Sequence, residues 1–338
     1  MKPGCWDRTL YVRPMASESL RRIAAVSQLK IGLQWGMALG LAVILFSGCS
    51  IRRLAVNRLG DALAAGGSTF SSDEDPELIR DAAPFSLKTM EVILADAPKH
   101  IELRRAAAAG FVQYAYAFVQ QEADELEQSD YSASETFRQR ARKLYLRGRS
   151  HGLRGLEARH AGFESFLRTN APGAVARLKR EDVPLLYWTC AAWAAAISQS
   201  KDQPELIGEL PLVQSMIDRA FVLDESWGSG AIHSFLVSYE MIRPGNVIEA
   251  VTRARQHFEK ARALSGRHLA GPYVGYAESV CVPMNDREQF EANLQEALKI
   301  NPDVHPEWRL ENLIMQRRAR WLLTRVDDFF VSHSKPSP

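Results

Sequence analysis

The chain has 338 residues, of which 46% are apolar and 24% are charged, so it is long enough to bury a substantial hydrophobic core. With 42 Lys and Arg against 40 Asp and Glu, its formal net charge is +2 at pH 7. This near balance gives no global argument for a nucleic-acid-binding protein.

An uncharged and largely apolar run covers residues 31–51 and follows Arg21, Arg22 and Lys30. A basic region before an apolar run is typical of a secretory signal peptide. Residues 1–48 hold six basic and two acidic residues, and the remainder holds 36 basic and 38 acidic residues. We therefore expect residues 1–48 to be a signal peptide. The unusual length of the basic region leaves a later start, at Met15, open.

The end of the apolar run, Leu45-Phe46-Ser47-Gly48-Cys49, resembles the bacterial lipobox, with Phe46 in the place of the usual Leu. The resemblance implies that Cys49 becomes the lipid-modified first residue. Several acyl chains would hold the protein at a membrane almost permanently, since each buried methylene contributes about 0.8 kcal/mol. Ser50 is not the Asp of the usual inner-membrane retention signal, which favours the outer membrane, facing the periplasm. A plain membrane-spanning anchor remains the alternative, because 21 uncharged residues just suffice to cross a bilayer.

The segment 49–74 is expected to hold the lipid attachment site and a tether. A short basic helix is predicted over 51–60, and the Gly- and Ser-rich stretch 64–72 predicts a loop. The folded domain, 75–335, begins with Asp75 as a helix N-cap and Pro76 in the first turn. We expect that helix to be interrupted near Pro84 and to end at 97–98, followed by an antiparallel partner over about 99–128.

The sign of the charge reverses further along the chain. Residues 122–130 carry five acidic residues, whereas residues 138–159 carry eight Lys or Arg and one Glu. One interpretation is a face that binds anions. The other is a solvated helix face neutralised by the neighbouring acidic helix. The stretch lacks interleaved stacking aromatics, which argues against nucleic acid.

A recurring helical face organises the second half of the chain. Ala254, Phe258, Ala261 and Leu264 follow one another at steps of four, three and three residues, so they lie on one side of a helix. The same face recurs at 213–223 and 290–300, and more loosely at 86–98 and 141–151. A small third residue lets a neighbouring helix approach closely, as a tetratricopeptide-type hairpin requires. We therefore predict an all-α fold, a tetratricopeptide-like solenoid of helical hairpins.

The repeat centres Ile217, Phe258 and Leu294 are 41 and 36 residues apart, close to the roughly 34 of a tetratricopeptide unit. Asn285 and Glu288 predict a capping box at the start of the last repeat helix. A long helix over 306–331 is expected to cover the last hairpin, with its charged face to solvent as a C-terminal cap.

The stretch 185–197 is apolar all round and too short to span a membrane, which predicts a central buried helix. Aromatic residues gather here and in the first arms of the following hairpins, where they are expected to line a groove for a ligand or partner. The alternative is ordinary packing between helices. Together with one histidine, the candidate groove residues are Tyr187, Trp188, Trp193, Trp227, His233, Tyr239, Tyr273 and Tyr276.

No catalytic, cofactor-binding or metal-binding motif with defined spacing is present. His151 and His160 lie about half a turn apart on a helix, which argues against their binding one metal ion together. We therefore expect no enzyme activity, no cofactor and no metal, with a hydrolase that uses an unrecognised site as the remaining enzymatic alternative. Cys190 and Cys281 each lie in an apolar helical pattern. An exported protein permits a disulfide between them, but two buried thiols are the simpler interpretation.

Two stretches, Tyr187-Trp188-Thr-Cys190-Ala-Ala-Trp193 and 221–235, resemble the TatT family of tetratricopeptide-type lipoproteins of tripartite ATP-independent (TRAP) transporters. Residues 88–120 are similar to the first hairpin of that family, and the resemblance runs from the lipobox to about residue 323. It implies an exported, lipid-anchored homo-oligomer, specifically a trimer, that pairs with the substrate-binding protein of the transporter. It also implies a small organic acid or hydrophobic ligand, because such transporters import small organic anions. A general envelope scaffold that binds a protein or peptide is the alternative function.

Overall fold

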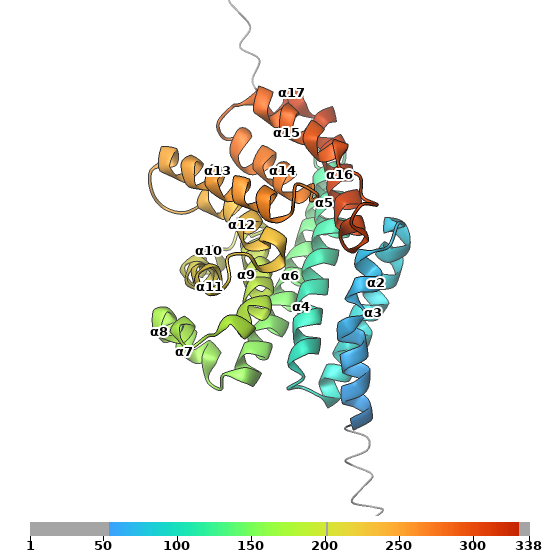
Figure 1. The fold of residues 1–338 in the computed structure, drawn as a ribbon, viewed down its shortest axis with the longest axis vertical. Helices are drawn as coiled ribbons and strands as arrows, with labels where there is room; N and C mark the ends of the chain where they lie inside the picture. The colour runs from blue at the N-terminus through green and yellow to red at the C-terminus, as the bar shows by residue number, and fades with distance from the viewer. Residues whose placement is uncertain (1–53, 201, 331–338) are drawn as a thin grey trace, which may run out of the picture. The chain divides into compact units, whose positions relative to one another are not determined.

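The computed structural model describes residues 54–200 and 202–330, and the leader, Cys49 and Ser50 lie outside these ranges. The protein is 80% helical and has no strand within the described ranges, which confirms the predicted all-α class. The chain runs through successive antiparallel helices, from the N-terminal helices beside α4 to α17 near residue 330 (Figure 1).

The first helices are more regular than the sequence predicts. Residues 54–65 are helical and α2 covers Gly67–Ser71, so the expected loop over 64–72 is wrong. Apolar side chains explain the difference. Leu63 packs against the buried cluster around Leu94 and Leu103, and Phe70 packs against a second cluster. The segment therefore gains apolar burial that a free tether would not have.

Helix α3 covers Pro76–Asp96, and the Asp75 side chain caps it by accepting hydrogen bonds from the backbone N–H of Glu77 and Leu78. The expected interruption at Pro84 is wrong, because the helix continues through it. Proline removes one backbone hydrogen bond. Burial of Ile79 before it and Leu87 after it holds both halves of the helix in one line.

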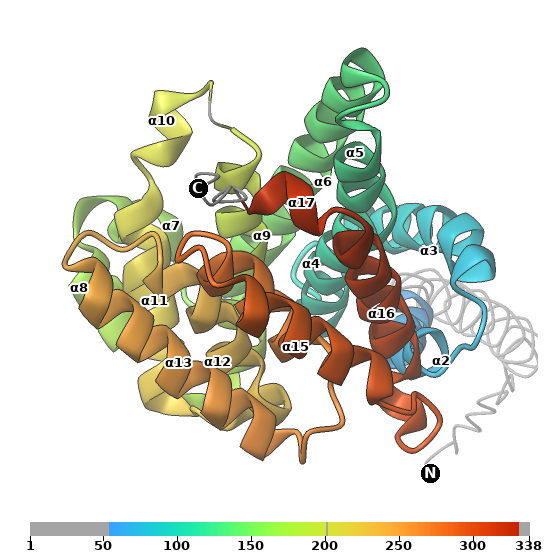
Figure 2. The same cartoon turned by 90° about the horizontal axis from the view of Figure 1, so that it is seen from above.

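The partner of α3 consists of α4 (Ile101–Ala115), a π-helical turn (Tyr116–Gln120) and α5 (Gln121–Leu126), which together match the predicted arm over about 99–128. Helix α6 (Tyr131–Arg159) follows, and α9 (Val183–Ser198) packs against both α4 and α6. These three helices lie side by side in both views (Figures 1 and 2). As predicted, α9 is the buried central helix.

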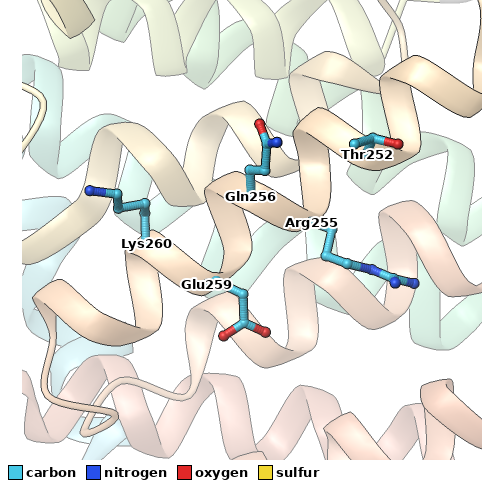
Figure 3. Close-up of a pocket in the computed structure, with 5 residues that line it drawn as sticks. All are labelled: Thr252, Arg255, Gln256, Glu259 and Lys260. Carbon is cyan, nitrogen blue, oxygen red and sulfur yellow. The ribbon is translucent and has the colours of Figure 1, made fainter.

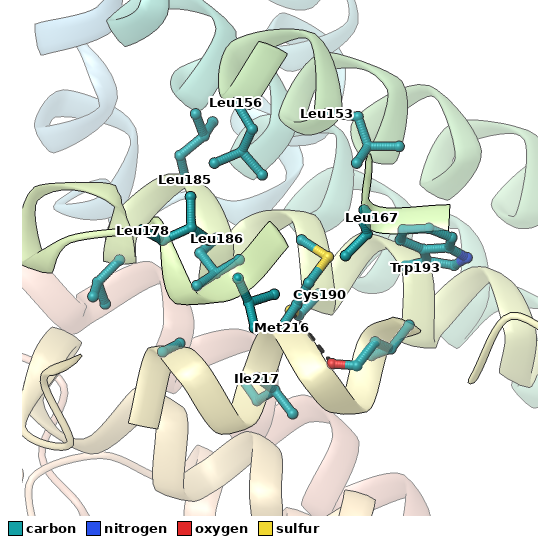
Figure 4. Packing of buried hydrophobic residues seen from close by; sticks show 14 of the residues in the cluster. Leu153, Leu156, Leu167, Leu178, Leu185, Leu186, Cys190, Trp193, Met216 and Ile217 are labelled. Atoms are coloured by element: carbon teal, nitrogen blue, oxygen red, sulfur yellow. Dashed lines mark hydrogen bonds between the residues drawn. The ribbon is translucent and has the colours of Figure 1, made fainter. Parts of the chain in front are cut away.

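Between α6 and α9 the chain forms α7 (Phe163–Thr169), α8 (Ala171–Ala176) and a 3-10 turn (Arg180–Asp182). After α9 come α10 (Pro204–Ile207) and α11 (Leu210–Leu223). Cys190 on α9 and Met216 on α11 face each other across one hydrophobic core (Figure 4). Cys281 belongs to a different core, and both cysteines are buried free thiols rather than a disulfide.

The three predicted repeat helices are α11, α13 (Val247–Leu264) and α15 (Arg287–Lys299). Their central residues, Ile217, Phe258 and Leu294, are all buried, which confirms the repeat register. The first arms are α12 (Trp227–Glu240) and α14 (Gly271–Tyr276), the latter extended by a π-helical turn over Ala277–Cys281.

The expected capping box at Asn285 is wrong, and a close helix contact at Gly230 was not predicted. The N-cap of α15 is Asp286, which accepts a hydrogen bond from Gln289, whereas Asn285 adopts a left-handed φ of 55° in the preceding turn. Asn285 therefore supplies the turn and Asp286 the cap. At the start of α12, Gly230 has a φ of 95° and approaches Ala261, because a Cβ there would lie 3.0 Å from the Ala261 Cα.

The C-terminal segment is divided into a 3-10 turn (Pro306–Trp308), α16 (Arg309–Thr324) and α17 (Val326–Phe329), so the continuous helix predicted over 306–331 is wrong. Helix α16 packs against α14 and α15, so it covers the last hairpin as expected, but its charged face does not lie wholly in solvent. Helix α16 lies beside α2, α3 and α5 (Figures 1 and 2) and packs directly against α2 and α3. Its arginines satisfy carboxylates of the N-terminal helices, since Arg317 pairs with Glu125 and Arg318 with Asp124.

Candidate functional site

Five of the eight predicted groove residues are buried in the protein. Trp193 is 0% exposed, and its indole Nε1 donates a hydrogen bond to Glu209 Oε2 at 2.9 Å. Arg149 and Arg168 also bind Glu209 and lie over the Trp193 ring. Burial raises the pKa of Glu209, but hydrogen bonds from Arg168 and Trp193 and the charge of Arg149 outweigh it, so the net shift is downward. Trp193 therefore presents no ring surface to a ligand.

The three buried tyrosines also have partners for their hydroxyl groups. Tyr239 donates to the backbone oxygen of Leu210, whereas Tyr273 accepts from Arg262 and Tyr276 accepts from Arg255. Tyr276 stacks on Phe258 with the ring centroids 4.4 Å apart. These contacts explain the three residues as core packing.

His233 forms a histidine pair that the sequence did not predict. Its Nδ1 lies 2.8 Å from Nδ1 of His257, which joins α12 to α13. The pair borders a pocket of about 240 Å³ whose lining includes Asp218, Glu240 and His257. Burial lowers the pKa of His233 to about 4 and also lowers that of His257.

Tyr187, Trp188 and Trp227 are the three predicted groove residues that reach solvent, and each is half-buried. Tyr187 lies at the centre of this group. Its ring centroid is 4.7 Å from that of Trp227, 5.1 Å from that of Trp188 and 6.4 Å from that of Phe235. Helices α9 and α12 bring these rings together, and Phe235 joins a site for which the sequence did not single it out.

Glu311 on α16 follows Leu310, which packs against the same hydrophobic cluster as Trp188. A Cβ on Gly271 would lie 3.3 Å from Glu311 Oε1, which places the carboxylate against the start of α14. Its charge also raises the pKa of Tyr187, after the larger effect of burial. We call Tyr187, Trp188, Trp227, Phe235 and Glu311 the aromatic–carboxyl cluster. No sequence pattern pointed to Glu311, because its position follows from the path of α16 through the fold.

The aromatic–carboxyl cluster has unused polar groups. The Tyr187 hydroxyl, the indole N–H groups of Trp188 and Trp227 and the Glu311 carboxylate have no hydrogen-bond or ion-pair partner in the described ranges. Polar groups without protein partners at half-buried rings are what a small-molecule site offers, since the rings supply contact area and the polar tips fix orientation.

The basic stretch of α6 is neutralised by carboxylates from several elements. Five arginines are paired, namely Arg138 with Glu127, Arg142 with Asp202, Arg147 with Glu91, Arg149 with Glu209 and Arg159 with Asp182. These pairs favour the neutralised helix face over an anion-binding face. The acidic partners come from more than the neighbouring acidic helix.

A second surface depression lies on the outer side of α13. It is lined by Thr252, Arg255, Gln256, Glu259 and Lys260, which project from one helix in Figure 3. A hollow built by the turns of one helix does not enclose a ligand.

Neither a metal site nor a membrane span is found in the part of the chain that the structure describes. No group of three or more His, Cys, Asp or Glu residues there is placed to hold a metal ion. No described helix combines the length and the apolar character needed to cross a bilayer.

Residues 72–330 match the TRAP transporter T-component family. The chain belongs to this family. A protein of Treponema pallidum (strain Nichols), which bears the name "Uncharacterized protein", is 30% identical to this T-component over 306 residues, covering 85% of this chain and 95% of the relative. The resemblance of 187–193 and 221–235 to this family is thereby confirmed. The protein is an accessory component of a TRAP transporter, a non-catalytic role associated with the cell envelope.

Proposed function

We propose that this T-component is a lipid-anchored periplasmic protein that docks the substrate-binding subunit of its transporter and offers the aromatic–carboxyl cluster to a small ligand. The observation that carries the ligand part is the unused polar tips of Tyr187, Trp188 and Trp227 beside Glu311. Family membership supports the docking part. No bond chemistry is involved, since the protein holds and presents its ligand.

Docking is tested with the purified full-length T-component and the substrate-binding subunit of the same transporter. We expect a stable complex by analytical ultracentrifugation, and co-purification of that subunit from native envelopes. A substrate-binding subunit from an unrelated transporter is the control. If the cognate subunit fails to bind, while an unrelated envelope protein binds in its place, the general scaffold function holds instead.

The lipid anchor depends on Cys49 and, with Ser50 beside it, is proposed to lie in the outer membrane. Cys49→Ala removes the acylated thiol, so the variant should lose labelling by a fatty-acid probe and appear in the soluble periplasmic fraction. Cys5→Ala is the control, because Cys5 lies in the proposed signal peptide. Continued acyl labelling of the Cys49→Ala variant would refute the attachment site.

The family resemblance implies a trimer. We propose that the copies associate through the outer face of α3. Leu78, Phe85 and Val92 repeat every seven residues and are 57%, 79% and 68% exposed. Large apolar side chains exposed on one face of a helix can form an interaction surface. Asp81 and Lys88 flank it with opposite charges, so that a second copy meets complementary charges. Phe85→Ser should lower the mass measured by light scattering to that of the monomer, with Val222→Ser, at an exposed residue of α11, as the control.

A further inference from the structure

Glu311 is the only group of the aromatic–carboxyl cluster that is charged near neutral pH. It lacks a basic partner within the described ranges. Three of the four arginines of α16 are engaged elsewhere, and the fourth, Arg320, lies nine residues after Glu311 and about half a turn round the helix from it. Arg309 binds Asp303 and the backbone oxygen of Ser72, Arg317 binds Glu125, and Arg318 binds Glu278. An organic anion at the cluster would meet a carboxyl group and no described cation.

Two histidines near the start of α16, His268 and His305, have other contacts. His268 and His305 contact one another with their ring centroids 4.5 Å apart, and His305 also contacts Trp308 and Glu307. No charged neighbour contributes to the pKa of Glu311, which burial alone shifts. On α9 the Glu311 charge raises the pKa of Tyr187, which is a neutral phenol, and on α14 the neighbour of the carboxylate is Gly271.

The rings next to Glu311 complete a different kind of site. Tyr187 and Trp227 lie with their centroids 4.7 Å apart, and both are half-buried, so part of each ring reaches solvent. The face of an aromatic ring attracts a positive charge, and Trp and Tyr attract it most strongly. A carboxylate beside such rings provides the counter-charge for an ammonium group.

We propose that the aromatic–carboxyl cluster binds a small organic molecule through a positively charged nitrogen, with Glu311 as its counter-ion and the rings of Tyr187 and Trp227 around it. A zwitterion satisfies this requirement, whereas a simple organic anion does not. The inference rests on the proposed ligand role of the cluster and is independent of docking to the substrate-binding subunit.

The ionisation of Glu311 adds a pH dependence to this binding. Its side chain reaches solvent, yet the surrounding protein raises the pKa of Glu311 to about 7 by desolvation. An exposed side chain and a desolvated carboxyl group are compatible when the carboxyl group projects into a small body of water enclosed by protein. A cation prefers the ionised form, so its affinity rises with pH. For a pKa of about 7 the ionised fraction changes about tenfold between pH 6 and pH 8.

Three probes with the same ring and different charge test the inference by calorimetric titration of the full-length protein in detergent. They are benzylamine, which is protonated throughout, neutral benzyl alcohol and anionic benzoate. We expect benzylamine to bind at least tenfold more tightly than benzoate at pH 8, and to lose about tenfold in affinity at pH 6. Benzyl alcohol should show no such pH dependence.

Glu311→Gln keeps the shape of the side chain and removes its charge. We expect this variant to lose the preference for benzylamine over benzyl alcohol and the pH dependence of binding. Glu288→Gln, at an exposed residue of α15, is the matched control and should behave as the wild type. Benzoate binding as tightly as benzylamine, or no detectable binding of benzylamine, would overturn the inference. Docking of the substrate-binding subunit, measured separately, would stand in either case.

Discussion

Gly152 of α6 and Thr189 of α9 are in direct contact, because a Cβ on the glycine would lie 2.1 Å from Thr189 Oγ1 and 3.2 Å from its Cα. The Thr189 hydroxyl cannot turn away freely, since it donates a buried hydrogen bond to the backbone oxygen of Leu185. The central helices therefore touch at a point where only glycine fits. This contact fixes the position of α9, which carries Tyr187 and Trp188.

Gly152→Ala should destabilise the protein. The added methyl group gains helix propensity but forces α6 and α9 apart, and overpacking of a core costs about 1–3 kcal/mol. Urea unfolding followed by circular dichroism measures the change. Gly275→Ala is the matched control, because nothing lies within 4 Å of its Cβ position in α14. That variant should gain up to about 1 kcal/mol, and an equal loss in both would contradict the close contact.

Removal of the Arg318 charge should be costly. Its side chain is 10% exposed and binds Asp124 and Glu278, which lie on different elements. Arg318→Met leaves Glu278 without a cation and Asp124 with only Arg138 at 3.8 Å, and breaking a buried pair in this way costs about 3–5 kcal/mol. The pKa of Asp124 is already raised by burial, against the lowering effect of Arg318, so it should rise further in the variant.

The control for Arg318 is another arginine with two carboxylate partners. Arg287 binds Glu291 and Asp327 but is 48% exposed. Exposed ion pairs contribute little to stability, so Arg287→Met should lower the free energy of unfolding far less than Arg318→Met does. Similar losses in the two variants, measured by urea unfolding at pH 7, would show that the Arg318 pairs are not buried in solution.

The histidine pair should make stability depend on pH. The folded-state pKa values of His233 and His257 are lowered, mainly by burial, so the unfolded chain binds more protons as pH falls below about 6.5. Stability is therefore full above that pH and is lost toward the folded pKa of His233, about 4. Glu225 opposes the shift at His233 and Glu240 that at His257, whereas Lys260, Arg243 and Arg253 reinforce the shifts.

His257→Gln keeps a hydrogen-bonding group near His233 and removes one titrating ring. Between pH 7 and pH 5 the wild type should lose more of its unfolding free energy than the variant, because the folded protein lowers the pKa of His257. Urea titrations at these two values measure the difference, and carboxylates that titrate in both proteins cancel. A wild-type profile as flat as that of the variant would contradict a proton-sensitive pair.

The two buried cysteines should remain thiols even in an oxidising compartment. Cys190 and Cys281 lie in separate cores, and burial raises the pKa of both, that of Cys281 to about 12. The thiolate is the reactive form. Iodoacetamide should therefore label neither residue in the native protein and both in urea, as measured by mass spectrometry. A peptide linked through Cys190 and Cys281 would contradict the separation of the cores.

The features predicted correctly from the sequence are those that depend on neighbouring residues. The faces of α11, α13 and α15 repeat over a few turns of one helix, so Ile217, Phe258 and Leu294 could be placed in the core. The apolar character of α9 likewise predicted its burial. The continuation of α3 through Pro84 could not be predicted in this way, because it depends on tertiary packing on both sides of the proline.

The candidate site was predicted only in part. Aromatic residues are favoured both in cores and at sites, and the sequence does not separate Trp193, whose indole binds Glu209, from Trp227, which reaches solvent. Glu311 could not be assigned, since its role follows from the path of α16. The sequence pattern predicted a charged face in solvent for the end helix, whereas Arg317 and Arg318 form ion pairs with the helices near the start.

The return of α16 to the N-terminal helices has a mechanical consequence. An open stack of hairpins can fray from its last unit, one repeat at a time. Here α16 forms ion pairs with the N-terminal helices, so a force applied to either end of the domain acts on the same ion pairs. The domain should therefore unfold in one cooperative step rather than repeat by repeat. A further repeat added after α16 would have to preserve the ion pairs between α16 and the N-terminal helices.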